Sequence, residues 1–269
     1  MVKNFAFLVV AQDSPKYNRL RRWQEKTWVK DFKDVAQVFY VYGDKRLEFS
    51  EIEGESKYPK DGKEFAFPMI REKNGDLICQ SAGGWSELLP NTVSALQHLL
   101  DRHNFDFIIR TNLSTYWNAD TLINLINEQD SELVFMGPIV NEDKGTFVAG
   151  YAMIFSRNTI RKLIDNPELI DFTIIDDVAI SKSLMKQSIH PTNIDLPWVT
   201  IRNFASLLLP PKCRRYRPLA IMSVLDLSES IGIRCREDRR IGPFNFRIDF
   251  VHYALIQFFI DMARRKGAK

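Results

Sequence analysis

The chain has 269 residues, 45% of them hydrophobic and 26% charged, which is the composition of an ordinary globular protein with a sizeable core. Its 37 Lys and Arg against 34 Asp and Glu leave a net charge of only +3, too little to indicate nucleic-acid binding. The three cysteines, Cys79, Cys213 and Cys235, are far apart, so we expect neither a disulfide framework nor a zinc knuckle, and a reducing compartment fits best.

Strands and helices alternate along the first 190 residues, which predicts an α/β fold with a mostly parallel sheet covered by helices. The region 45–84 is charged and predicts an excursion with one or two short strands. In chain order we expect a strand at 5–11, a helix at 18–28, a strand at 35–41, a helix at 91–103, a strand at 105–109 that ends in a polar turn at 110–115, a helix at 119–127, strands at 133–136 and 150–156, and helices at 157–164 and 178–185.

The C-terminal part is distinctly basic, with the runs KCRRYR at 212–217 and RCREDRR at 234–240. Residues 249–262 predict an amphipathic helix, and residues 202–269 as a whole predict a helical, basic appendage. Core packing is the default interpretation of that helix. The alternative is docking onto an anionic membrane that carries a lipid-linked acceptor.

Four segments resemble, in order and spacing, the glycosyltransferase family that includes the β-1,3-galactosyltransferases and Fringe. The first joins the strand at 5–11 to RLRRWQEKTW and to the strand ending VYGD; the others are ELLPNTVSALQHLLDRHNFDFIIRTNLS, GYAMIFSRNTIRKL and IDDVAI. They cover residues 2–186, roughly two thirds of the chain. The resemblance implies a GT-A-like, Rossmann-type sheet that holds a nucleotide sugar, in a domain spanning 1–201.

The family's Asp-x-Asp motif, whose carboxylates hold a divalent cation on the diphosphate, corresponds to Asn112, Leu113 and Ser114. Amide and hydroxyl oxygens are neutral and weak ligands for a hard cation. We therefore expect no metal and no other cofactor; Mn²⁺ or Mg²⁺ would bind only if the degenerate motif still holds a metal. His190 corresponds to the family's late third ligand, but a lone histidine is more often structural.

The resemblance implies that Asp177, in IDDVAI, is the general base that takes the proton of the acceptor hydroxyl, with Asp176 beside it. An Asp at a helix start is also an ordinary cap, and the two roles are compatible because a helix N-terminus keeps a carboxylate ionised.

A leaving diphosphate needs a positive partner, and arginine suits this role through its fixed fork of donors. The candidates are Arg110, then Arg19 or Arg22, and the pair Arg234 and Arg236. The alternative for Arg110 is a surface ion pair with a nearby acid.

Other expected donor contacts lie where the predicted strands end, because open α/β sheets bind ligands there. Three of these places have a plain structural alternative: a simple turn at Gln12 and Asp13, the end of a strand at Gly43 and Asp44, and core packing at Tyr151. These expected contacts are Ala11, Gln12, Asp13, Gly43, Asp44, Thr111, Asn112 and Ser114, with Gly150 and Tyr151 near donor and acceptor.

We therefore expect an inverting glycosyltransferase (a hexosyltransferase) that moves a sugar from UDP- or another nucleotide sugar to a glycan hydroxyl in surface polysaccharide synthesis. It would be cytoplasmic or peripheral at the inner face of a membrane, and its acceptor could be lipid-linked. One alternative is a catalytically inactive relative that binds a glycan or a partner. Nucleic-acid binding is not expected, because no phosphate-cradling GxxxxGK loop is present.

Overall fold

The computed structural model describes residues 3–47, 57–60, 63–66, 68–130, 132–143, 145–194, 198–201, 232–235, 257 and 261. The chain divides into two compact units. The first comprises residues 1–18, 33–113 and 126–194, and the second comprises residues 19–32, 114–125 and 195–269.

The first unit is built on an eight-stranded sheet. Its strands are β1 (Phe5–Val10), β2 (Ala36–Gly43), β5 (Ile70–Lys73), β6 (Asp76–Cys79), β7 (Phe107–Asn112), β9 (Phe135–Gly137), β12 (Ala152–Ser156) and β13 (Thr192–Asn193). They lie in the order β13-β9-β12-β7-β1-β2-β6-β5, and β5 and β12 run opposite to the other strands. This mostly parallel sheet confirms the predicted fold class.

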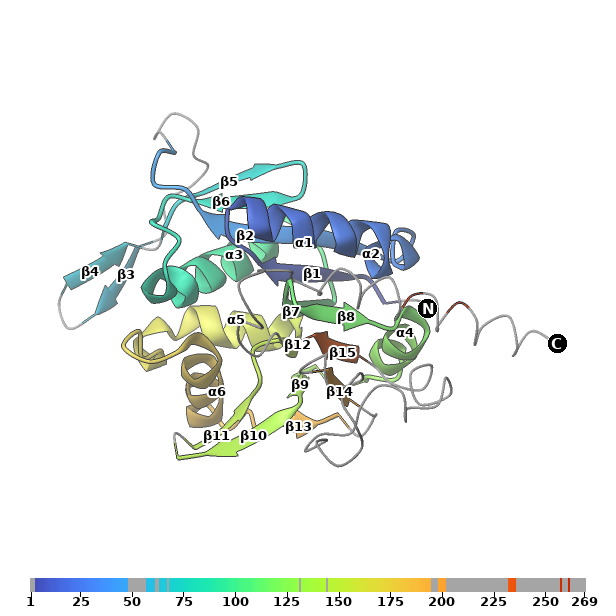
Figure 1. The fold of residues 1–269 in the computed structure, drawn as a ribbon. Helices are drawn as coiled ribbons and strands as arrows, with labels where there is room; N and C mark the ends of the chain where they lie inside the picture. The colour runs from blue at the N-terminus through green and yellow to red at the C-terminus, as the bar shows by residue number, and fades with distance from the viewer. Residues whose placement is uncertain are drawn as a thin grey trace, which may run out of the picture. The chain divides into compact units, whose positions relative to one another are not determined.

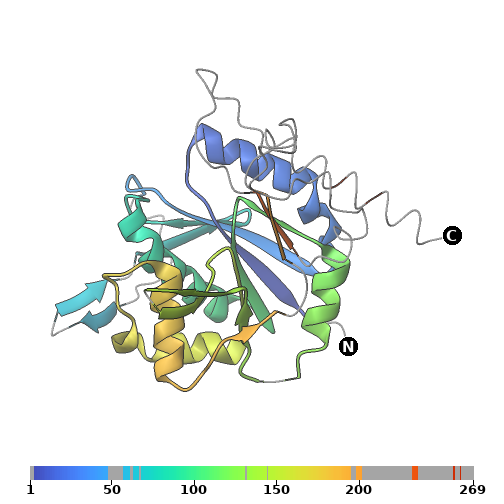
Figure 2. The same ribbon diagram turned by 60° about the horizontal axis from the view of Figure 1, so that its bottom comes forward.

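Three helices pack beside this sheet: α3 (Leu88–Arg102), α5 (Arg157–Asp165) and α6 (Asp176–Lys186) (Figures 1 and 2). One hydrophobic core joins them to the strands, with Leu8 of β1, Leu96 of α3, Leu163 of α5 and Leu184 of α6 all fully buried. Burying each such leucine contributes about 1.5–3 kcal/mol relative to exposure, so this core holds the three helices against the strands.

The central strand β1 is buried on both faces, as expected within a parallel sheet. Its register aligns Val10 with Val41 of β2 and with Asn112 of β7. The carboxyl ends of these three strands are therefore level at one edge of the sheet, the edge at which ligands bind in open α/β folds.

Smaller elements complete the first unit: the hairpins β3 (Lys57–Lys60) with β4 (Lys63–Ala66) and β10 (Ile139–Glu142) with β11 (Gly145–Val148), and the 3₁₀ turns η2 (Trp85–Glu87) and η3 (Pro167–Leu169). The excursion 45–84 holds four strands where one or two were predicted. The prediction failed because each of these strands is only four residues long, so its alternation is too short to detect.

The second unit contains most of α1 (Pro15–Lys26) and of α4 (Ala119–Asn127), together with α2 (Trp28–Asp31). Its sheet has the order β14-β15-β8, formed by β14 (Trp198–Ile201), β15 (Gly232–Cys235) and β8 (Thr115–Trp117). Buried Tyr116 donates through its hydroxyl to Oε1 of Gln257 at 2.8 Å. Gln257 and Asp261 are helical, whereas the rest of the predicted helix 249–262 lies outside the described residues, and the predicted boundary at 201/202 stays a prediction.

Strand β7 corrects one sequence-based expectation. Residues 110–112 were predicted to begin a polar turn, but they continue the strand, and the turn comes at Leu113 and Ser114. A polar run can stay in a buried strand when its groups are paired. Here Arg110 forms an ion pair with Asp176, and Thr111 donates to the carbonyl of Tyr151 at 2.8 Å.

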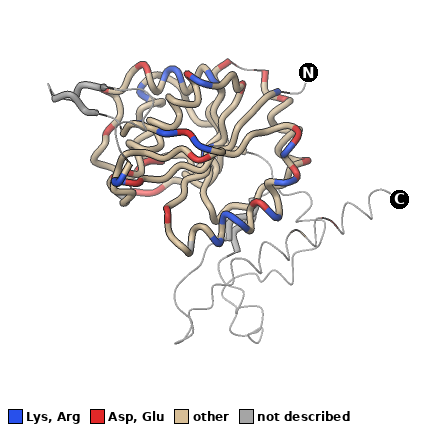
Figure 3. The backbone as a smooth tube through the Cα atoms, turned by 90° about the horizontal axis from the view of Figure 1, so that it is seen from above, with Lys and Arg blue, Asp and Glu red and all other residues tan. Residues whose placement is uncertain are grey.

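Charges of both signs are interspersed along the described chain (Figure 3). The basic run at 212–217 lies outside the described residues, so its predicted role stays a prediction. Within the described part, no helix combines the length and the apolar character needed to cross a membrane.

Candidate functional site

A buried ion pair joins the central strand to the start of α6. Arg110 of β7 and Asp176, the first residue of α6, are each only 4% exposed, and Nη2 of Arg110 donates to Oδ2 of Asp176. Alternation along β7 places Arg110 on the same face as Ile108, the face covered by α3. Arg110 does form an ion pair with an acid, but the pair is buried, whereas the sequence-based alternative was a pair at the surface.

Asp177 lies next to this pair and is only partly buried. Its Oδ2 accepts from the backbone N–H of Gly150 at 3.1 Å, and its Oδ1 accepts from the N–H of Val178 at 2.9 Å. The N-cap residue, Ile175, has no side-chain oxygen to cap the first turn of α6, so Asp177 itself satisfies one of the free N–H groups there, that of Val178. The carboxylate is thereby held in one orientation while part of it stays accessible.

Burial raises the pKa of Asp177 above the ordinary range for Asp, and the negative charge of Asp176 raises it further. The Gly150 hydrogen bond, the Arg110 guanidinium and the Val178 hydrogen bond act in the opposite direction on this pKa. A carboxylate with a raised pKa is a stronger proton acceptor once ionised, which is the property required of a general base.

The backbone of Gly150 fits between Arg110 and Asp177. A Cβ at this position would lie 2.5 Å from Nη1 of Arg110 and 3.2 Å from Oδ2 of Asp177. The guanidinium cannot easily move aside, because Asp176 holds its other nitrogen. Because Gly150 has no side chain, the loop before β12 can lie close to both Arg110 and Asp177. The sequence analysis had singled out these three residues separately.

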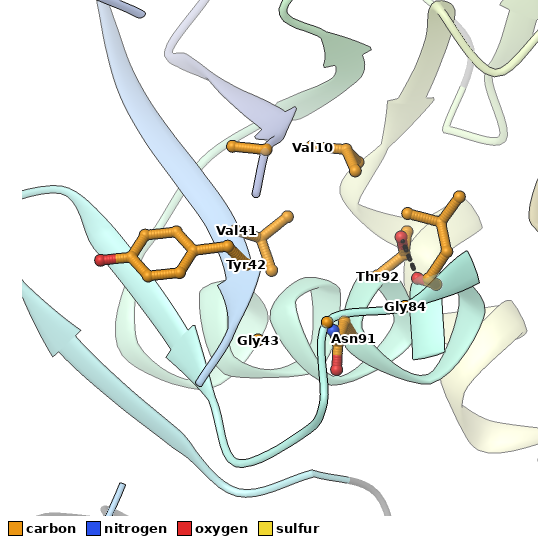
Figure 4. A pocket seen from close by; sticks show the side chains of 10 residues that line it. Val10, Val41, Tyr42, Gly43, Gly84, Asn91 and Thr92 are labelled. Carbon is orange, nitrogen blue, oxygen red and sulfur yellow. Dashed lines mark hydrogen bonds between the residues drawn. The ribbon is translucent and has the colours of Figure 1, made fainter. Parts of the chain in front are cut away.

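A pocket opens at the same edge of the sheet, beyond the ends of β1 and β2 (Figure 4). Its volume is about 250 Å³, a figure that includes space open to solvent. Ala11 and Gly43, both predicted donor contacts, line it. The other lining residues are Val10, Val41, Tyr42, Gly83, Gly84, Leu88, Asn91 and Thr92.

Gly43 has a structural reason to be glycine. A Cβ there would collide with Oγ of Ser81 and would lie 2.6 Å from the backbone nitrogen of Gly83. Gly83 itself has φ +70°, a left-handed conformation that favours glycine. The loop after β6 therefore packs directly against the end of β2, and these two backbones form one wall of the pocket.

Polar side chains beyond β1 and β2 form a small exposed network. Asp44 accepts three hydrogen bonds from Arg46, two from its side chain and one from its backbone, at 2.9–3.0 Å. The Arg46 side-chain hydrogen bond is the main cause that lowers the pKa of Asp44 to about 2. Asp13 lies 3.9 Å from the same guanidinium. Arg46 was not singled out in the sequence, because it lies in the poorly patterned region 45–84.

The residues at the position of the metal motif do not fit a divalent cation. Asn112 ends β7 with a neutral amide, Leu113 is buried and apolar, and Ser114 offers only a hydroxyl. No group of three or more His, Cys, Asp or Glu suited to a metal occurs among the described residues, and His190 is exposed. The donor chemistry therefore supplies no carboxylate where the resemblance would place the cation.

The remaining candidates are divided between the two units and the residues that the structure does not describe. Arg19, Arg22 and Ser114 belong to the second unit, as does Arg234 in β15, while Arg236 is outside the described residues. Gln12 is exposed after β1.

The sequence analysis did not single out Asn91, because the helix was expected to begin at that residue. Helix α3 in fact starts at Leu88 and tolerates Pro90 in its first turn, so Asn91 lies inside the helix.

Solved structures similar to this chain are glycosyltransferases. GlyE of Streptococcus pneumoniae TIGR4 matches with TM-score 0.45 and 12% identity over 99% of this chain, and its apo form with 0.48 and 13% over 100%. An active-site mutant of LgtC matches with TM-score 0.46 and 9% identity, over 93% of this chain and 95% of LgtC. The chain spans 65% of the length of GlyE. Because the TM-scores of all three structures are below 0.5, the function proposed next rests on the residues of this chain.

No protein-family model and no curated protein matches the chain.

Proposed function

We propose that the protein is an inverting, metal-independent glycosyltransferase that moves a sugar from a nucleotide sugar to a glycan hydroxyl. The observation that carries the proposal is the environment of Asp177: a half-buried carboxylate with a raised pKa, oriented by two backbone N–H groups at the carboxyl edge of the parallel strands. The resemblance of four sequence segments to the β-1,3-galactosyltransferase and Fringe family supports the same assignment.

In this reaction Asp177 accepts the proton of the acceptor hydroxyl. The oxygen then forms its bond to the anomeric carbon from the face opposite the leaving group, while the bond from that carbon to the diphosphate oxygen breaks. The nucleoside diphosphate leaves with the electron pair of that bond. The backbone N–H groups of Gly150 and Val178 fix the orientation of the carboxylate, because each donates to a different one of its two oxygens.

Arg110 has a different part in this proposal from the one the sequence suggested. Because Asp176 already binds its guanidinium, Arg110 orients the base and offsets its charge, and it does not bind the diphosphate directly. For the positive partner of the diphosphate, Arg19, Arg22 and the Arg234 and Arg236 pair stay predictions. The lipid-linked acceptor and the peripheral membrane contact also stay predictions.

The first test is binding of the donor. We expect one nucleotide class among UDP-, GDP-, TDP- and CMP-sugars to raise the thermal midpoint selectively, since a ligand present at 100 times its Kd stabilises the folded state by about 2.7 kcal/mol. The screen is run with and without Mn²⁺. A chain that responds to none of these donors under either condition contradicts the proposal.

Metal independence has its own test. We expect transfer to the acceptor to continue at an unchanged rate in excess chelator, because Asn112 and Ser114 offer only neutral oxygens at the position of the metal motif. Complete loss of turnover in chelator, restored by Mn²⁺, would show that the degenerate motif still binds a cation.

The alternative of a catalytically inactive glycan- or partner-binding relative is favoured by the same neutral motif. It makes a distinct prediction, since such a protein would bind a glycan but would show no transfer with any donor.

A further inference from the structure

The loop between β11 and β12 is fixed on both sides of Gly150. Before this glycine, the backbone N–H of Val148 donates to Oγ of Ser181 in α6 at 3.1 Å. After it, the hydroxyl of Thr111 in β7 donates to the carbonyl of Tyr151 at 2.8 Å. Both of these hydroxyl-bearing residues are fully buried. The loop is therefore tied to α6 at one end and to β7 at the other, and Gly150 lies between the two contacts.

The N–H of Gly150 needs such anchors to keep one direction. Glycine has the freest backbone of all residues, so Gly150 alone does not fix the orientation of its N–H. This N–H nevertheless lies 3.1 Å from Oδ2 of Asp177 and donates to it. Side chains alternate along β7, so Thr111 holds the loop from the side of the strand that Arg110 does not reach.

The fold by itself gives no preference for a hydroxyl at Thr111. The residue lies within a buried strand, where valine has nearly the same shape, the same β-branched character and no polar group to satisfy. What the hydroxyl adds is the hydrogen bond to Tyr151. Its position next to the loop that orients Asp177 points to a purpose in the site.

We infer that Thr111 is a positioning residue for the general base: its hydroxyl holds the loop at Tyr151, so that the N–H of Gly150 stays directed at Asp177. The inference rests on the proposed function. This role differs from the donor contact expected from the sequence, because the hydroxyl is buried and donates to the protein's own backbone.

Loss of the Thr111 hydroxyl is expected to act on Asp177 through the loop. The Gly150 hydrogen bond lowers the pKa of Asp177, because it stabilises the ionised carboxylate. When this hydrogen bond weakens, the pKa of Asp177 rises further, and less of the base is ionised at a given pH. The acid limb of the pH–rate profile should therefore move to higher pH.

The test is Thr111→Val, which keeps the shape of the side chain and removes the hydroxyl. We expect kcat for sugar transfer to fall about 10–100-fold, as for a small misplacement of a reacting group, while KM for the nucleotide sugar stays unchanged. Thr111→Ser keeps the hydroxyl and should recover most of kcat. In Thr111→Val, the acid limb of the profile and the titration of the Asp177 carboxyl, followed by ¹³C NMR, should both lie at higher pH than in the wild type.

Thr159→Val is the matched control. Thr159 of α5 is also fully buried, and its hydroxyl pairs with Oγ of Ser156 at 3.0 Å, at the end of β12 opposite to the loop. Each valine variant loses one buried hydrogen bond, so we expect both thermal midpoints to fall by about 2–4 °C. Only Thr111→Val should change kcat and the pH–rate profile.

Three outcomes would overturn the inference: Thr111→Val keeps the kcat and pH profile of the wild type, Thr111→Ser loses as much kcat as Thr111→Val, or only KM for the nucleotide sugar changes. The last outcome would make Thr111 a donor contact, as the sequence suggested. In each case the proposed function stands as long as the wild type transfers a sugar. A wild type that transfers none overturns the proposed function, and the NMR titration then decides separately whether Thr111 orients Asp177.

Discussion

Asp177→Asn is expected to lower sugar transfer by about 10²–10⁴-fold, the usual contribution of a positioned general base, while donor affinity is retained. The substitution keeps the size of the side chain and removes its ability to accept a proton. Donor binding is measured by calorimetry and transfer by release of nucleoside diphosphate in the presence of acceptor. Retained donor affinity also shows that the site is still folded, which matters because Asn can accept from only one of the Gly150 and Val178 N–H groups.

Asp165→Asn supplies the control. Asp165 is exposed at the end of α5, so this variant has the same change in net charge without touching the site. We expect its turnover to equal that of the wild type. Wild-type turnover in Asp177→Asn would remove Asp177 from the mechanism, and absence of turnover in the wild type itself, with glycan binding present, would favour the inactive relative.

Arg110→Met is expected to destabilise the protein by about 3–5 kcal/mol, because it leaves the Asp176 carboxylate buried without its partner. For a chain of this size the thermal midpoint should fall by about 6–20 °C. The double variant Arg110→Met with Asp176→Leu should recover most of this loss, since removing both charges leaves no uncompensated ion. Thermal and urea unfolding of the two single variants and the double variant complete the cycle.

Arg21→Met is the matched comparison for an exposed pair. Arg21 donates to Glu25 at 2.9 Å one helical turn away, and such pairs contribute only about 0.3–0.5 kcal/mol. The contrary outcome is that Arg110→Met unfolds at the wild-type temperature and binds the donor more weakly. In that case Arg110 binds the diphosphate, as the sequence suggested, and its ion pair with Asp176 does not contribute to stability.

Local patterns were sufficient for several parts of this fold. The strand β1, the helix α4 and the start of α6 were predicted to within a residue or two, because their apolar periodicity is strong and their neighbours in the chain mark the ends. The short strands β3 to β6 were not, since four residues carry too little periodicity to distinguish a strand from a loop.

The sequence by itself determined the α/β class and singled out Asp177, because both depend on residues that are close together in the chain. Only the tertiary structure decided that Arg110 is buried against Asp176, a partner 66 positions away, and that Gly150 fits between Arg110 and Asp177. Likewise, nothing near Asn91 in the chain indicates that β1, β2 and the Gly83 loop enclose a pocket beside it. The pairing of a buried charge or amide depends on which distant residues packing brings within hydrogen-bond distance, and local propensity does not contain that information.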